Sequence, residues 1–175
     1  MTRASDVHWL YHETVRFFPA QWQRFAAGAG NAPDLVAAYD RLLNGDADPE
    51  VRLRAARDWC DWEDAIVSLE EGWRPSEMFA DPAFRVTFAR LCAHYFSHAA
   101  WLEDGQLLRD AGRLAGIGGV LIHGRLDLSC PATTAWELAR AWPGAELLID
   151  DHSGHRGSDI KRTWMVETLA KFARR

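Results

Sequence analysis

Apolar residues recur every three to four positions through the first two thirds of the chain, which is the spacing of amphipathic helices. One helix start is formed by Asp48 as N-cap and Pro49 at the first helical position. The stripe that follows it is Val51, Ala55, Trp59, Trp62, Ile66 and Leu69. Asp81 and Pro82 repeat this start, and the next stripe is Phe84, Phe88, Leu91 and Tyr95. We predict a further helix after Pro19, with Trp22, Phe25 and Ala26 on one face, and two more from 33 to 44 and from 106 to 114.

The pattern changes after residue 116. Residues 118–124 form a short apolar run bounded by glycines, which is typical of a fully buried parallel strand. A helix beginning at Pro131 and ending at Pro143 separates this run from a second strand at 145–150, and a last helix runs through Phe172. We therefore predict an α/β fold that is predominantly helical, with a helical domain at 1–116 and a β-α-β-α unit at 117–175.

Two strands do not make a stable sheet by themselves. The helical half, a second copy of the chain or a different protein must cover the strand edge and the sheet faces. We expect a homodimer or a complex with a partner chain.

Composition narrows the classes of partner. The chain has 175 residues, a net charge of −5 and no basic stripe, so nucleic acid is not an expected partner. No run approaches the roughly 18 apolar residues of a membrane span, and the first residues lack the apolar core of a secretory signal. The three cysteines are scattered, which favours a reducing compartment. We expect a cytoplasmic protein without membrane contact.

Asp127 and His155 are the candidate catalytic residues. Asp127 follows the first predicted strand and His155 follows the second, so both lie at the edge where open α/β sheets place ligands. In serine hydrolases an Asp orients the His that accepts the nucleophile's proton. A G-x-S-x-G turn would precede this pair in an α/β-hydrolase, and no such motif occurs in the 175 residues. Outside a hydrolase, Asp127 would only cap a turn and His155 would be an ordinary loop residue.

The run GVLIHGRLDLSCPATTAWELARAWPGAELLIDDHSGH resembles the C-terminal part of proline iminopeptidases, which are serine aminopeptidases of the α/β-hydrolase fold. The resemblance extends upstream through WLYHETVRFFPAQWQRF, DWCDWEDA and ARLCAHYFSHAAWLEDGQLL, and so covers nearly the whole chain. It implies that the helical half is the cap domain over an active site, and that residues 118–175 are the last strands and helices of the hydrolase sheet. Asp127 and His155 match the family's catalytic Asp and His. The family's first strands, oxyanion loop and nucleophilic Ser have no counterpart in this sequence.

The resemblance also implies substrate-binding residues in the cap. Glu63 matches an acidic residue that holds the substrate's free amine, and Cys92 stands where the family has a second acid. Loss of one carboxylate would weaken recognition of a prolyl amine, because a desolvated ammonium loses a partner. We also assign Trp59 and Tyr95 to the substrate cavity. In the alternative interpretation, Glu63 is a solvated helix carboxylate and Cys92 is a packing residue.

Two functions follow from these residues. The first is a truncated proline iminopeptidase-like hydrolase that acts on amino-acid or peptide-like substrates only when another polypeptide supplies the nucleophile. The alternative is a non-hydrolytic protein that binds a small molecule, or a repurposed biosynthetic enzyme that uses His155 as a general base.

Histidine pairs at i, i+4 spacing occur at His8 and His12 and at His94 and His98, and this spacing can present two metal ligands on one helix face. The same spacing is common by chance, and His94 lies in the HYF run that resembles the family. We expect a structural role for these histidines, with no metal and no cofactor.

Overall fold

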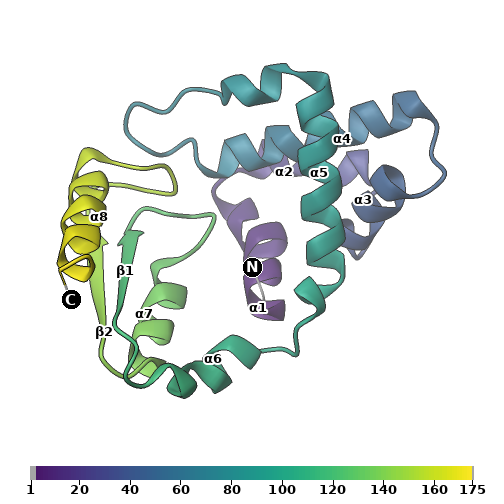
Figure 1. The fold of residues 1–175 in the computed structure, drawn as a ribbon. Coiled ribbons are helices and arrows are strands. Elements are labelled where there is room, and N and C mark those ends of the chain that lie inside the picture. Colours follow the sequence, from purple (N-terminus) through teal and green to yellow (C-terminus); the bar gives the residue numbers. More distant parts are fainter. Residues whose placement is uncertain (1–2, 175) are drawn as a thin grey trace. The chain divides into compact units, whose positions relative to one another are not determined.

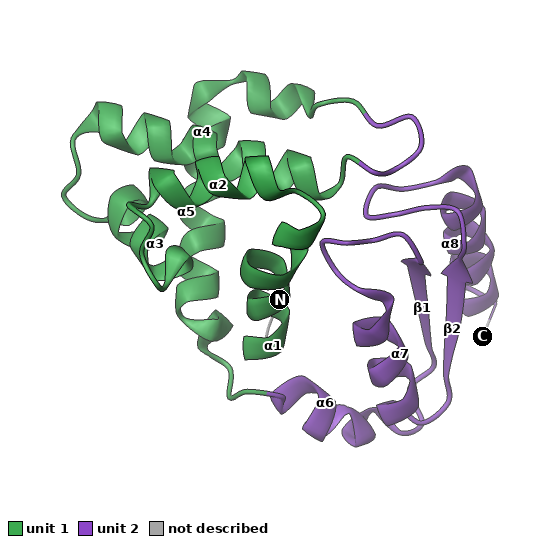
Figure 2. Ribbon diagram, turned by 180° about the vertical axis from the view of Figure 1, so that it is seen from behind, with its two compact units in different colours: residues 1–68, 74–104 green, residues 69–73, 105–175 purple. Residues whose placement is uncertain are grey.

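The computed structural model describes residues 3–174, and the chain divides into two compact units (Figures 1 and 2). Unit 1 holds the chain up to Ser68 and the segment Arg74–Asp104. Unit 2 holds Leu69–Trp73 and the chain from Gly105 onward. Residues 105–116, which the sequence pattern grouped with the helical half, belong to unit 2, where α6 packs against α7.

Unit 1 is helical. Its elements are α1 (Ala4–His8), the π-helical turn η1 (Trp9–Glu13), the 3₁₀ turn η2 (Thr14–Arg16), α2 (Pro19–Gly28), α3 (Leu35–Asn44), α4 (Pro49–Ile66), η3 (Glu77–Ala80), α5 (Pro82–Ser97) and η4 (Ala99–Trp101). The helix α5 packs against both α3 and α4, and α2 packs against α4.

Aspartate caps begin three of these helices. The Asp48 carboxylate accepts a hydrogen bond from the Glu50 amide at 2.8 Å, and Asp81 caps α5 in the same way, as the sequence predicts. The start of α3 was predicted at Pro33 but lies at Leu35, because Asp34 takes the N-cap position and binds the Ala37 amide at 2.9 Å.

Aromatic rings fill the core of unit 1. The side chains of Tyr11, Phe25, Tyr39 and Trp59 are fully buried, and their ring centroids lie 4.5–5.8 Å apart. The α4 stripe is confirmed at its centre, where Ala55, Trp59, Trp62 and Ile66 are buried, but Leu69 lies beyond the helix and is exposed.

The predicted stripe of α5 is wrong in its second half. Leu91 and Tyr95 are exposed, and the buried positions are Ala89 and Ala93. Because α5 lies against two helices, small side chains on the contact face allow the close approach, and the larger side chains turn outward.

Unit 2 contains the two predicted strands, β1 (Gly119–Gly124) and β2 (Ala145–Asp150), which pair in parallel from Gly119 opposite Ala145 to Gly124 opposite Asp150. Its helical elements are α6 (Gln106–Asp110), η5 (Ala111–Leu114), α7 (Ala132–Ala141) and α8 (Asp159–Phe172). The expectation of a fully buried first strand is wrong, since its central residues are only half-buried.

Large apolar side chains remain exposed on the helices of unit 2. Trp136 on α7 and Met165, Val166 and Leu169 on α8 each expose more than half of their surface. So many large exposed apolar side chains are unusual on helices that face only water. Within residues 3–174, no helix combines the length and the apolar character needed to span a membrane.

Candidate functional site

Asp127 lies in the loop between β1 and α7, where its own side chain closes a turn. One carboxylate oxygen accepts the Cys130 amide at 2.8 Å, and the side chain is 6% exposed. The β1 loop is also tied to the β2 loop by the Arg125 amide, which donates to the Asp150 carbonyl, and by the Leu126 amide, which donates to Ser153. These bonds fix the position of Asp127 relative to the loop that follows β2.

The two loops approach each other so closely that residue 124 must be glycine. A Cβ atom at Gly124 would lie 2.4 Å from the carbonyl oxygens of Ser153 and Gly154. Any side chain there would force the β2 loop away from Asp127.

His155 lies in the β2 loop and pairs with Asp127. Its Nδ1 donates to the second carboxylate oxygen of Asp127 at 3.0 Å, and the His155 side chain is half-exposed. The sequence expectation that these two residues come together is met by this distance. The geometry is that of an Asp that orients a His, with the Cys130 side chain as a further partner of the imidazole.

The hydrogen bond from His155 to Asp127 raises the pKa of His155 to about 10, with a further contribution from Cys130 and against the effect of burial. The imidazole is therefore protonated at neutral pH. A general base must be unprotonated to accept a proton, so the pair at rest is an ion pair rather than a poised base.

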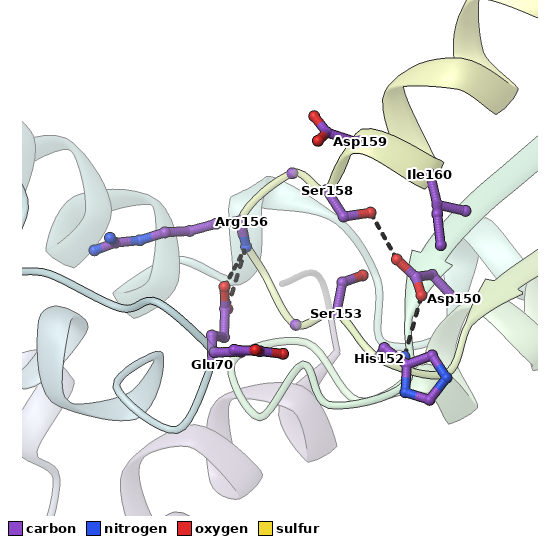
Figure 3. Close-up of a pocket in the computed structure, with 11 residues that line it drawn as sticks. Glu70, Asp150, His152, Ser153, Arg156, Ser158, Asp159 and Ile160 are labelled. Carbon is purple, nitrogen blue, oxygen red and sulfur yellow. Dashed lines mark hydrogen bonds between the residues drawn. The ribbon is translucent and has the colours of Figure 1, made fainter.

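Glu70 supports the loop that carries His155. Its carboxylate accepts hydrogen bonds from the backbone amides of His155 and Arg156. The Arg156 amide lies 3.2 Å from both carboxylate oxygens (Figure 3). Glu70 was not recognised in the sequence, because an exposed-looking Glu-Glu pair between two helices carries no local signal.

Replacing Glu70 with Ala is expected to lower the hydrogen-exchange protection of the His155 and Arg156 amides by at least about tenfold, because each loses a bond to a charged acceptor. Glu71→Ala removes the neighbouring carboxylate and serves as the matched control, with unchanged protection expected at these two amides. Equal protection in both variants would show that the loop is held without Glu70.

A pocket of about 450 Å³ lies beside this loop. Its polar lining includes Glu70, Asp150, His152, Arg156 and Ser158, and the Ser158 hydroxyl donates to Asp150 at 2.6 Å (Figure 3). This bond is the main cause that holds the pKa of Asp150 below its usual range. The His155 side chain does not line the pocket, so the pocket is separate from the Asp127–His155 pair.

The predicted substrate residues lie in unit 1, and two of them, Glu63 and Cys92, lie close to each other and to Tyr11. The Tyr11 hydroxyl donates to the Glu63 carboxylate at 3.5 Å. Burial and the Glu63 charge raise the pKa of Tyr11, and the same two causes raise the pKa of Cys92 to about 12. The Tyr11 ring also lies 5.5 Å from that of Trp59. Tyr11 was not singled out in the sequence.

The other two predicted substrate residues, Trp59 and Tyr95, differ in exposure. Trp59 is fully buried among aromatic rings and thus has the position of a core residue. Tyr95 is half-exposed and packs edge-on against Trp101 at 5.2 Å. Their roles in substrate binding stay predictions.

Ligand atoms of Asp127, Cys130 and His155 all lie within 4.8 Å of one another. His123 lies next to this group, with its Nε2 2.7 Å from the Cys130 carbonyl oxygen and 3.8 Å from Asp127. The thiol of Cys130 is close enough to His155 to contribute to the raised pKa of the imidazole.

Comparison with known proteins supports the sequence resemblance. No family model matches the chain. The chain is 40% identical to the proline iminopeptidase of Xylella fastidiosa over 159 residues, which is 89% of this chain and 50% of that protein. It is 38% identical to the probable proline iminopeptidase of Streptomyces coelicolor over 97% of this chain and 54% of that protein. The proline iminopeptidase of Neisseria meningitidis serogroup A is 36% identical over 91% of this chain and 51% of its own length.

The chain spans about half the length of the curated relatives it matches. Over most of its own length, it is related in sequence to one part of the proline iminopeptidases, as its motifs indicate.

Proposed function

We propose that this chain is the cap and C-terminal part of a proline iminopeptidase-like α/β-hydrolase, and that it supplies the orienting Asp127 and the base His155 for acyl transfer. The observation that carries this proposal is the 3.0 Å contact between His155 Nδ1 and the Asp127 carboxylate, made by two loops that follow adjacent parallel strands. Relatives named proline iminopeptidase over the same residues support it.

The nucleophile would come from another polypeptide. On binding, that polypeptide would place a Ser hydroxyl at Nε2 of His155. The contact would displace water, and desolvation of the imidazolium would lower the pKa of His155 and favour the neutral imidazole that a base requires. The exposed apolar side chains of α7 and α8 are the surface that such a partner, or a second copy of this chain, would cover.

Glu63 would hold the amine of an amino-acid or peptide-like substrate. Tyr11 already donates to this carboxylate and would orient it. Because Cys92 replaces the second acid of the family, an ammonium would find one charge rather than two, and selectivity for prolyl substrates would be reduced. The three cysteines are free thiols, which suits a cytoplasmic location.

The test uses the purified chain and a polypeptide comprising the part of the Xylella fastidiosa relative that the chain does not match. With proline naphthylamide as substrate, we expect no release by either piece alone and measurable release by the mixture. His155→Ala should lower the rate of the mixture by about 10⁴-fold or more, because loss of a triad member leaves only oxyanion-hole and binding effects. His152→Ala, in the same loop, is the matched control and should retain the rate. Brisk turnover by the chain alone would contradict the proposal.

The half-exposed His155 ring, held by the buried Asp127 carboxylate, also suits a second candidate, a binding protein without a covalent step. An imidazolium at neutral pH would hold an anionic group of a small-molecule ligand instead of accepting a proton. Ligand binding that weakens in His155→Ala without any product formation by the mixed polypeptides would support this candidate.

A further inference from the structure

Three potential metal ligands meet on two packed helices of unit 1. Asp40 lies on α3, His94 lies in the last turn of α5, and His98 is the C-cap residue that follows this helix. One ligand atom from each of the three residues lies within 4.8 Å of the other two. The sequence shows the histidine spacing, and the structure adds the carboxylate from a different helix.

The separation of His94 and Asp40 fits a shared ion better than a direct bond. His94 Nδ1 lies 3.5 Å from the Asp40 carboxylate and is buried without a hydrogen-bond partner. Two ligands at ordinary Zn–N and Zn–O distances around a tetrahedral ion lie about 3.3 Å apart. The pair is therefore too far apart for a good hydrogen bond and close to the spacing that an ion imposes.

Neighbouring groups orient the other ligand atoms. His98 Nδ1 lies 2.8 Å from the His94 carbonyl oxygen and 2.9 Å from the Ser97 hydroxyl. Because a carbonyl oxygen can only accept, the first contact favours the tautomer with the proton on Nδ1 and the lone pair on Nε2. A backbone carbonyl in this role is a common partner of a metal-binding histidine. The Asn44 amide donates to the Asp40 carboxylate at 2.7 Å and so fixes its orientation.

The backbone after α5 is strained beside this cluster. Ala99, Ala100 and Trp101 have φ values of 49°, 52° and 56°, in the left-handed region that residues with a Cβ atom seldom adopt. This turn brings the Trp101 ring onto His98, with ring centroids 5.1 Å apart and an interplanar angle of 16°. Backbone strain of this kind persists where the surrounding structure requires it. Here the strained turn places the Trp101 ring against the His98 imidazole.

We propose that Asp40, His94 and His98 form a site for a divalent transition-metal ion of the Zn²⁺ type, with solvent as the fourth ligand at the exposed side of His98. Two imidazoles and one carboxylate suit Zn²⁺, whereas Ca²⁺ and Mg²⁺ require oxygen ligands. The ion links α3 to α5 and thereby stabilises unit 1. This site does not depend on the proposed hydrolase function.

The test is a titration of the metal-free chain with Co²⁺, followed by visible absorption, and with Zn²⁺, followed by thermal unfolding. We expect one equivalent of Co²⁺ to give d–d bands without the near-ultraviolet band of a thiolate ligand, and Zn²⁺ to raise Tm. His98→Ala should weaken binding by at least about 100-fold, since loss of an outer-shell partner alone can cost that much. Asp40→Asn should weaken it as well, and circular dichroism verifies that both variants are folded.

Two controls separate this cluster from the other candidate ligands. His12→Ala removes one member of the His8–His12 pair, whose rings stack at 5.1 Å. His155→Ala removes a member of the Asp127–Cys130–His155 group. Both should leave Co²⁺ affinity unchanged. No binding by the wild-type chain, unchanged binding in His98→Ala, or loss of binding in His155→Ala would each overturn the proposal.

Discussion

Replacing Asp127 with Asn is expected to lower the pKa of His155 from about 10 toward the ordinary value of 6.5, because the variant removes the carboxylate that accepts the Nδ1 proton. Burial of the ring then acts without opposition from the carboxylate. Titration of the His155 ring protons by NMR measures this change directly. Asp151→Asn is the matched control, because Asp151 lies in the same region but pairs with Arg125 instead; it should leave the His155 pKa unchanged.

The same pair makes stability depend on pH with a defined sign. The pKa of His155 is higher in the folded chain than in the unfolded chain, so the pair stabilises the fold fully below pH 6.5. This contribution is lost as pH rises through about 10. Denaturant unfolding of the wild type should show this loss between the two values, and Asp127→Asn should not. An identical pH dependence in both proteins would contradict the ion pair.

Replacing Trp59 with Ala is expected to lower the free energy of unfolding by about 3–5 kcal/mol, the usual cost of removing a large buried ring. Trp59 is fully buried and lies within 6 Å of the rings of Tyr11, Phe25 and Tyr39, so the cavity would open at the centre of the aromatic core. Chemical denaturation monitored by circular dichroism measures the loss. Trp59→Phe should cost far less, because it fills most of the space and removes an indole N–H that has no hydrogen-bond partner among the described residues.

Trp136→Ala provides the comparison on the surface. This ring is half-exposed and packs against the Arg140 guanidinium at 4.9 Å. Its loss should cost about 0.5–1 kcal/mol, the size of an exposed cation–π contact. Similar losses in Trp59→Ala and Trp136→Ala would show that the aromatic core contributes less than its burial indicates.

Local signals predicted the helix starts and the strands well. Asp48 and Asp81 satisfy free amides within two residues, so their effect is visible in a short stretch of sequence. The burial of α5 was predicted wrongly because it depends on which helices lie beside it. Periodicity cannot distinguish a face with Ala89 and Ala93 from one with Leu91 and Tyr95 when the neighbours are unknown.

The candidate site was predictable only where the pairing of the strands brings residues together. Asp127 and His155 follow two strands whose parallel pairing brings their ends together, so their contact follows from topology. Glu70 and Tyr11 act on residues 85 and 52 positions away, respectively, and nothing in the sequence near either residue indicates this. Asp40 and His94, whose side chains approach to 3.5 Å, are likewise far apart in the sequence.

The membership of Leu69–Trp73 in unit 2 affects how the chain can be divided. Starting expression at Gly105 would yield a fragment with both strands and the Asp127–His155 pair, but without the carboxylate that holds the amides of residues 155 and 156. No single cut of the polypeptide separates the two units with all their parts, because the chain passes from one to the other three times. Dissection of this protein therefore calls for point substitutions rather than for truncation.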